Sequence, residues 1–190
     1  MINRQEITGL VLAGGAGRRV QGRDKGLLNW RGQSLVSHVI ARMDRQVDRL
    51  LLSCNRNIEQ YRALDLELLV DSRANFQGPL AGLEAAAASV HSEYVAICAC
   101  DTPLVPTDLV ARLLLPFATS EGKSLDISYA DDGHHRHYLC ALVRSRCLPS
   151  LTSYLDDGQR TVHGWYELHN TVAVDFSDTP EAFQNLNQLS

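Results

Sequence analysis

The stretch Ile7-Thr8-Gly9-Leu10-Val11-Leu12-Ala13, followed at once by Gly14-Gly15, carries most of the information about the fold. It is apolar almost throughout, which is typical of a strand buried on both faces of a parallel sheet. The glycine-rich segment 14–26 begins where such a strand would open into its loop. The sequence therefore predicts an α/β protein with this strand near the centre of its sheet.

Apolar runs and amphipathic stretches alternate along the rest of the chain. Strands are predicted at 49–53, 66–70, 94–98, 127–130, 138–143 and 172–176, and helices at 34–48, 82–90 and 107–118. Ser34 and Thr107 are the predicted N-caps of the first and third helices. This alternation indicates right-handed βαβ units and a mostly parallel sheet covered on both faces, in one domain that spans residues 1–190.

Composition excludes several classes of protein. The chain has 190 residues with 18 Lys and Arg against 22 Asp and Glu, a net charge of −4, which argues against a nucleic-acid surface. No run approaches the ~20 apolar residues that span a bilayer, so no membrane segment is expected. The five cysteines are odd in number and lack a CxxC frame, so reduced thiols and a cytoplasmic location are expected. A monomer is expected.

The segment 14–26 suits a phosphate group. Its glycines let backbone N–H groups approach phosphate oxygens closely. Its cations are Arg18, Arg19, Arg23 and Lys25. The P-loop pattern fails because Arg23 follows Gly22, and the dinucleotide fingerprint fails because Val20 stands where it needs glycine. Phosphate binding without either motif is predicted, with a solvated surface loop as the alternative.

A third pattern does fit this segment. It comprises Leu12-Ala13-Gly14-Gly15, a basic residue at Arg19, Gly22 and Asp24-Lys25-Gly26-Leu27. The pattern resembles nucleotidyltransferases that join a nucleoside monophosphate to a phosphorylated acceptor, and most closely molybdenum cofactor guanylyltransferase, the MobA family. The resemblance runs from about residue 7 to about 187. It implies a Rossmann-like three-layer sandwich of the nucleotide-diphospho-sugar transferase type.

Further segments carry the same resemblance. They are Ser53-Cys54-Asn55-Arg56-Asn57, Asp71-Ser72, Gly78-Pro79-Leu80-Ala81-Gly82 and Cys100-Asp101-Thr102-Pro103. Most of them directly follow a predicted strand. Because the carboxyl ends of parallel strands meet at one edge of a sheet, these segments are expected to share one cleft.

The resemblance assigns roles to residues of this sequence. Catalysis is expected from Arg19, Lys25 and Asp101, and Asp101 is also expected to hold Mg²⁺, with a turn cap as its alternative role. The expected GTP-binding residues are Leu12, Ala13, Gly14, Gly15, Gly22, Lys25, Ser53, Asn55, Asp71, Gly78, Gly82 and Asp101.

The second half of the chain is expected to hold the acceptor. Residues 1–110 would form the GTP-binding half, and residues 111–190 the molybdopterin-binding half. The resemblance places Arg160, Asn185 and Asn187 at the acceptor. The histidine-rich loop His134-His135-Arg136-His137 is expected to line the acceptor side, with a metal site as the alternative.

The implied reaction transfers GMP from GTP to the terminal phosphate of molybdenum-molybdopterin and releases pyrophosphate. That phosphate is largely dianionic at neutral pH, so it needs no general base. Alternatives are a cytidylyltransferase on the same acceptor, a sugar-phosphate or polyol-phosphate nucleotidyltransferase, and a non-catalytic cofactor carrier. The expected partners are GTP and molybdenum-molybdopterin, with molybdopterin-handling proteins and apo-molybdoenzymes to receive the product.

Overall fold

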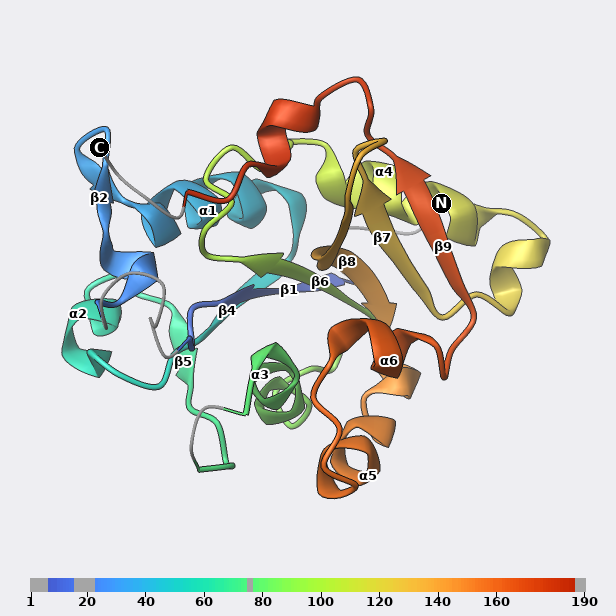
Figure 1. Ribbon diagram of the computed structural model, residues 1–190, viewed down its shortest axis with the longest axis horizontal. Helices are drawn as coiled ribbons and strands as arrows, with labels where there is room; N and C mark the ends of the chain where they lie inside the picture. The colour runs from blue at the N-terminus through green and yellow to red at the C-terminus, as the bar shows by residue number, and fades with distance from the viewer. Residues whose placement is uncertain (1–6, 16–22, 75–76, 187–190) are drawn as a thin grey trace.

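The computed structural model describes residues 7–15, 23–74 and 77–186. Its main sheet has seven strands in the order β5-β4-β1-β6-β8-β7-β9 (Figure 1). The strands are β1 Ile7–Leu12, β4 Arg49–Ser53, β5 Glu67–Leu69, β6 Tyr94–Ala99, β7 Ile127–Asp131, β8 Arg136–Arg144 and β9 Thr171–Asp175. Among these, β8 alone runs antiparallel to its neighbours, so the prediction of a mostly parallel sheet is confirmed.

Helices cover both faces of this sheet and complete three layers (Figure 1). On one face lie α1 Leu35–Met43 and α4 Leu109–Leu114, and on the other α3 Pro79–Ala86, α5 Ser150–Asp156 and α6 Val162–Tyr166. Alternate residues of β1 serve the two cores. Val11 packs with α1 and α4, whereas Leu10 and Leu12 pack with α3 and the later helices. This strand is buried at every position, as its apolar sequence predicts.

Smaller elements complete the fold. They are the helix α2 Ile58–Arg62, the hairpin β2 Asn29–Trp30 with β3 Gln33–Ser34, and the 3₁₀ turns η3 Lys25–Leu27, η4 Asp44–Gln46, η5 Leu115–Ala118, η6 Glu121–Lys123, η7 Ser145–Cys147 and η8 Pro180–Phe183. The sequence did not predict most of them, but the 3₁₀ turns at 44–46 and 115–118 lie within the predicted helices 34–48 and 107–118. None of the helices in the described segments is long and apolar enough to cross a membrane.

Helix ends test the predicted caps. Ser34 caps α1, because its hydroxyl accepts a hydrogen bond from the Ser37 amide at 3.3 Å. The prediction for Thr107 was wrong, since α4 begins after Asp108 and no side chain caps it. The α-helix that follows ends at Leu114, and Pro116 lies in the 3₁₀ turn η5, where its missing N–H cannot continue an α-helix.

Candidate active site

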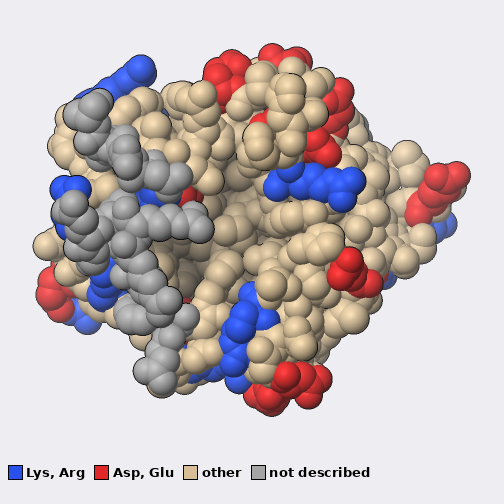
Figure 2. All heavy atoms as spheres, viewed as in Figure 1, with Lys and Arg blue, Asp and Glu red and all other residues tan. Residues whose placement is uncertain are grey.

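Several of the residues singled out by the sequence gather at the carboxyl-end edge of the sheet. Gly14, Asn55 and Asp101 follow β1, β4 and β6, which lie side by side and run parallel. The amino end of the antiparallel β8 reaches the same edge, and a cavity of about 520 Å³ opens there. Figure 2 shows this face hollowed near its middle, with basic side chains at the rim.

Lys25 and Asp101 form an ion pair at the centre of this edge. The Lys25 ammonium donates to Asp101 Oδ2, although the two residues are 76 positions apart in the sequence. Their side chains keep 21% and 17% of their exposure, so both groups can still meet a ligand. The pair therefore presents a cation for phosphate oxygens and a carboxylate for a metal ion at one point of the cleft.

Asp24 holds Lys25 in place. It is buried, and its two carboxylate oxygens accept from Tyr61 Oη at 2.7 Å and from Asn57 Nδ2 at 3.0 Å. Burial, together with this bond to the carboxylate, raises the pKa of the Tyr61 phenol. A Cβ at Gly26 would lie 2.5 Å from Tyr61 Oη, so only glycine fits there. Sequence reasoning gave Asp24 no role of its own, although it stands in the Asp24-Lys25-Gly26-Leu27 motif.

Asn55 and Asp71 bind each other across the ends of β4 and β5. Asn55 Nδ2 donates to Asp71 Oδ2 at 2.7 Å, and the Asp71 amide donates to Asn55 Oδ1 at 2.9 Å. Asp71 Oδ1 is buried and has no hydrogen-bond partner among the described residues. Burial raises the pKa of Asp71, and the bond from Asn55 opposes that shift. The site thus holds a fixed carboxylate with one acceptor oxygen unused.

Two glycines allow close packing beneath these groups. A Cβ at Gly14 would lie 2.8 Å from Asn55 Nδ2, and one at Gly82 would lie 2.5 Å from Ser53 Oγ and 2.9 Å from Leu12 Cδ2. Gly82 therefore brings α3 against β1 and β4. Leu12 serves the core through its side chain, while its carbonyl oxygen accepts from the Cys100 amide.

The remaining backbone groups of β1 extend the sheet. The Ala13 amide donates to the Ser53 carbonyl at 2.8 Å, and so the ladder continues one residue past the strands. Gly15 is exposed at the start of the loop. The predicted residues Arg19, Gly22 and Asn187 lie outside the described residues.

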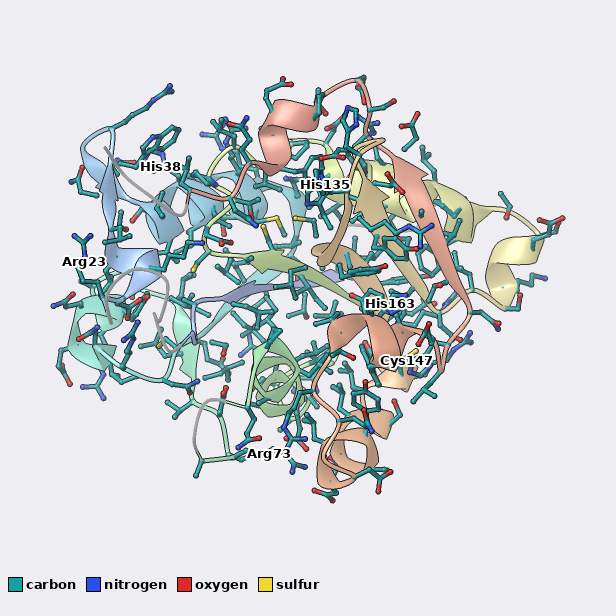
Figure 3. All side chains as sticks on the ribbon, in the orientation of Figure 1. Arg23, His38, Arg73, His135, Cys147 and His163 are labelled. Carbon is teal, nitrogen blue, oxygen red and sulfur yellow. The ribbon has the colours of Figure 1, made fainter. Side chains whose placement is uncertain are left out.

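Arg160 meets the turn that precedes α3. Its Nε donates to Gln77 Oε1 at 2.6 Å, and its carbonyl oxygen would lie 3.9 Å from a Cβ at Gly78. Gly78 has φ +90, a conformation that favours glycine. Arg160 is not among the described residues that line the cavity, whereas its neighbour Thr161 is. Arg73, labelled in Figure 3, ties this region to α3 and α5 through Glu84 and Asp156.

The cavity beside Asp101 is lined from three directions. Residues after β6, at the start of β8 and at the start of α6 contribute, and Asn185 closes one side. The lining residues are Ala99, Asp101, Thr102, Arg136, His137, Tyr138, Leu139, Cys140, Thr161, Val162, His163 and Asn185. The ring centroids of Tyr138 and His163 lie 5.2 Å apart with their planes tilted by 58°, so these two aromatic side chains together form one wall of the cavity. Figure 3 shows His163 projecting from α6.

A backbone hydrogen bond holds Asn185 near Asp101, because the amide of the next residue, Leu186, donates to the Asp101 carbonyl at 3.1 Å. Sequence reasoning missed Tyr138 and His163. The signal for Tyr138 was present, because it stands at the start of a predicted strand.

Of the three histidines in the histidine-rich loop, His137 lines the cavity. Its Nε2 lies 2.8 Å from Asp132 Oδ2, and its ring stacks on Phe183. Burial of Asp132 raises its pKa, but the hydrogen bonds from His137 and from the amides of His135 and His134 outweigh that effect and lower the value to about 2. Within the described residues, these histidines belong to no cluster of three ligands that could hold a metal ion.

The edge also suits a hard divalent cation. Mg²⁺ binds proteins through one or two carboxylates and completes its shell with waters and phosphate oxygens. Asp101 is a strand-end carboxylate that keeps part of its exposure and faces the cavity, and the Asn185 side chain lines the same space. The donor set therefore fits such a cation.

Fold and site together define the class. This is an α/β protein whose polar residues gather outside the carboxyl ends of parallel strands, the position at which open sheets bind nucleotides and similar ligands.

Comparison with known proteins narrows this class. The family model for the MobA-like NTP transferase domain matches residues 9–172, and the chain belongs to that family. A molybdenum cofactor guanylyltransferase from Shewanella frigidimarina is 36% identical over 96% of this chain and 91% of that relative.

Solved structures share the fold. Molybdopterin-guanine dinucleotide biosynthesis protein A from Archaeoglobus fulgidus superposes with a TM-score of 0.74 at 21% identity, covering 95% of this chain and 92% of that one. A protein from Mycobacterium tuberculosis in complex with manganese superposes with a TM-score of 0.66 at 19% identity, covering 94% and 98%.

Proposed function

We propose that this nucleotidyltransferase transfers GMP from GTP to the terminal phosphate of molybdenum-molybdopterin, forming the guanine dinucleotide cofactor and pyrophosphate. The observation that carries the proposal is the position of the Lys25–Asp101 pair. It stands between the Asn55–Asp71 pair on one side and the cavity with its aromatic wall on the other. The 36% identical relative supports the same assignment.

The Asn55–Asp71 pair would bind the base. Guanine presents two adjacent N–H donors, at N1 and N2, and Asp71 Oδ1 is a buried acceptor without a partner among the described residues. Asn55 fixes the carboxylate from the other side. Cytosine has an acceptor at N3 where guanine has the N1–H, so a carboxylate that accepts both guanine donors, through Oδ1 and the second lone pair of Oδ2, favours GTP over CTP.

The cavity would bind the acceptor. The aromatic rings of Tyr138 and His163 would pack against a pterin ring, and Arg136 and His137 supply polar contacts at the same lining. Asp101 belongs both to this lining and to the ion pair with Lys25. An acceptor phosphate in the cavity would therefore lie next to the cation that neutralises the GTP phosphates.

The reaction needs positioning more than acid–base chemistry. The acceptor phosphate is already a dianion and attacks the α-phosphorus in line, so the α-phosphorus to oxygen bond of pyrophosphate breaks as the new one forms. Lys25 would hold the charge that builds on the α-phosphate and the leaving group. A Mg²⁺ ion bound at Asp101 would supply further neutralisation of the triphosphate. Arg19 is proposed to assist Lys25.

Acceptor-dependent pyrophosphate release tests the proposal. The purified chain, GTP, Mg²⁺ and molybdenum-molybdopterin are expected to yield pyrophosphate, and CTP in place of GTP is expected to yield much less. A non-catalytic carrier would bind the acceptor and release none. We further propose a cytoplasmic monomer, since GTP is supplied there; size-exclusion chromatography with light scattering tests the oligomeric state.

A further inference from the structure

A second cluster of chemically active side chains lies at the opposite edge of the sheet. Asp126 precedes β7, Cys147 closes η7 after β8, and His169 follows α6. One ligand atom from each lies within 4.8 Å of the other two. Asp101 follows the carboxyl end of β6. Because β8 runs antiparallel to both β6 and β7, the start of β7 and the end of β8 lie at the opposite edge of the sheet from the Lys25–Asp101 pair. Figure 3 shows Cys147 beside α6, well separated from Arg23.

Hydrogen bonds around Ser150 fix the tautomer of His169. Ser150 Oγ donates its one proton to the Cys147 carbonyl at 2.7 Å. It can therefore only accept from Trp165 Nε1 at 2.8 Å and from His169 Nε2 at 3.2 Å. The proton of His169 then sits on Nε2, which leaves the lone pair of Nδ1 available. A neutral imidazole held in this way is the usual state of a metal-binding histidine.

Hydrogen bonds also fix the carboxylate of Asp126. Its Oδ1 accepts from Arg146 Nε at 2.9 Å, and its Oδ2 accepts from the Asn170 amide at 3.1 Å. Each carboxylate oxygen has a further lone pair for another bond. The Cys147 thiol is buried, whereas Asp126 and His169 are half-buried, so an ion can reach the cluster from solvent.

We propose that Asp126, Cys147 and His169 form a Zn²⁺ site, with water as the fourth ligand. A thiolate, an imidazole and a carboxylate are the ligand types that zinc selects over magnesium or calcium. Tetrahedral bonds of about 2.0–2.3 Å place ligand atoms ~3.5 Å apart, so the three groups move inward by about 1 Å or less. The Cys147 S–H bond breaks, the thiolate binds the ion, and the proton passes to solvent.

Such an ion would join three segments that are distant in the sequence. It would tie the start of β7 to the turn after β8 and to the segment after α6, all at the end of the sheet away from the proposed active site. The role is therefore stabilisation of the second half of the fold, independent of nucleotide transfer.

Cobalt substitution tests the site directly, because Co²⁺ bound to a thiolate gives a ligand-to-metal charge-transfer band in the near ultraviolet. The untagged full-length protein, stripped with a chelator, is expected to bind about one Co²⁺ per chain with this band, and Zn²⁺ should displace it. Cys147→Ser and His169→Gln should each abolish the band, while the matched controls Cys54→Ser and His91→Gln should keep it. Ser150→Ala should weaken Zn²⁺ binding by about 10- to 100-fold, because it frees the His169 ring.

Circular dichroism of each variant separates a lost ligand from a lost fold, and His169→Gln decides the matter if Cys147→Ser does not fold. A wild-type protein without the band, or a folded Cys147→Ser or His169→Gln variant that keeps it at full strength, would overturn the proposal.

Discussion

Asp71→Asn tests whether the unused carboxylate oxygen recognises guanine. The side chain keeps its shape, and an amide oxygen can still accept from Asn55 Nδ2. An NH₂ group then occupies the place of Oδ1, so a donor faces the guanine N1–H where an acceptor stood. One hydrogen bond to a charged group contributes about 1.5–3 kcal/mol. We therefore expect GTP to bind about 10- to 150-fold more weakly.

The substitution Asp71→Asn should not lower the stability of the folded protein. Burial raises the pKa of Asp71 in the folded protein, so the ionised carboxyl is disfavoured there and its removal costs no folding stability at neutral pH. The assay is calorimetry of GTP and CTP with Mg²⁺, paired with urea unfolding. Asp48→Asn, at an exposed aspartate, is the matched control and should change neither. Unchanged GTP affinity in a folded Asp71→Asn protein would refute the assignment of the base contact.

Three further predictions concern the ion pair, the packing and the acid stability. Lys25→Ala and Asp101→Ala should each lower turnover by about 10²-fold or more and leave the circular dichroism unchanged. Because the two groups touch, the double variant should lose less transition-state stabilisation than the two single variants lose together. A loss of helical signal in either variant would indicate a structural role instead. Gly82→Ala should lower the free energy of unfolding by about 1–3 kcal/mol in urea titrations, because its Cβ would lie 2.5 Å from Ser53 Oγ; unchanged stability would show that α3 can shift outward. The pKa of Asp132 is lowered to about 2 in the folded protein, so its ionised carboxylate should contribute about 2 kcal/mol of stability that is present above about pH 4 and lost as the pH falls toward 2. In a plot of the urea unfolding midpoint against pH, Asp132→Asn should flatten the slope between about pH 4 and 2. An equally steep slope in the variant would contradict the prediction.

Much of the fold could be predicted from hydropathy because each central strand is a continuous run of apolar residues in the sequence. The run at β1 is buried at every position, which requires near-uniform apolar residues and leaves a clear signal. The helices α5 and α6 have only seven and five residues, too short for a helical period to stand out. The burial of α6 depends on Trp165 and Tyr166 packing in the core on that face of the sheet, a contact that no local pattern encodes.

Some residues of the candidate site could likewise be predicted from the sequence, and others could not. Asn55, Asp71 and Asp101 could be predicted because each follows a parallel strand, and the edge where such strands end is known in advance. Tyr138 stands at the start of a strand, and its place at the same edge depends on β8 running antiparallel to β6, which the sequence does not reveal. The burial of Asp24 likewise depends on Tyr61, 37 residues away in the chain.

The most direct test of the proposed function is the identity of the nucleotide in the product. Molybdenum-molybdopterin is supplied together with equal amounts of GTP and CTP, Mg²⁺ and the purified chain, and the dinucleotide products are separated and weighed by mass spectrometry. We expect the guanine dinucleotide to dominate, and to disappear when Lys25→Ala replaces the wild-type protein. A cytosine dinucleotide as the main product, or no dinucleotide at all from a folded protein, would contradict the proposal.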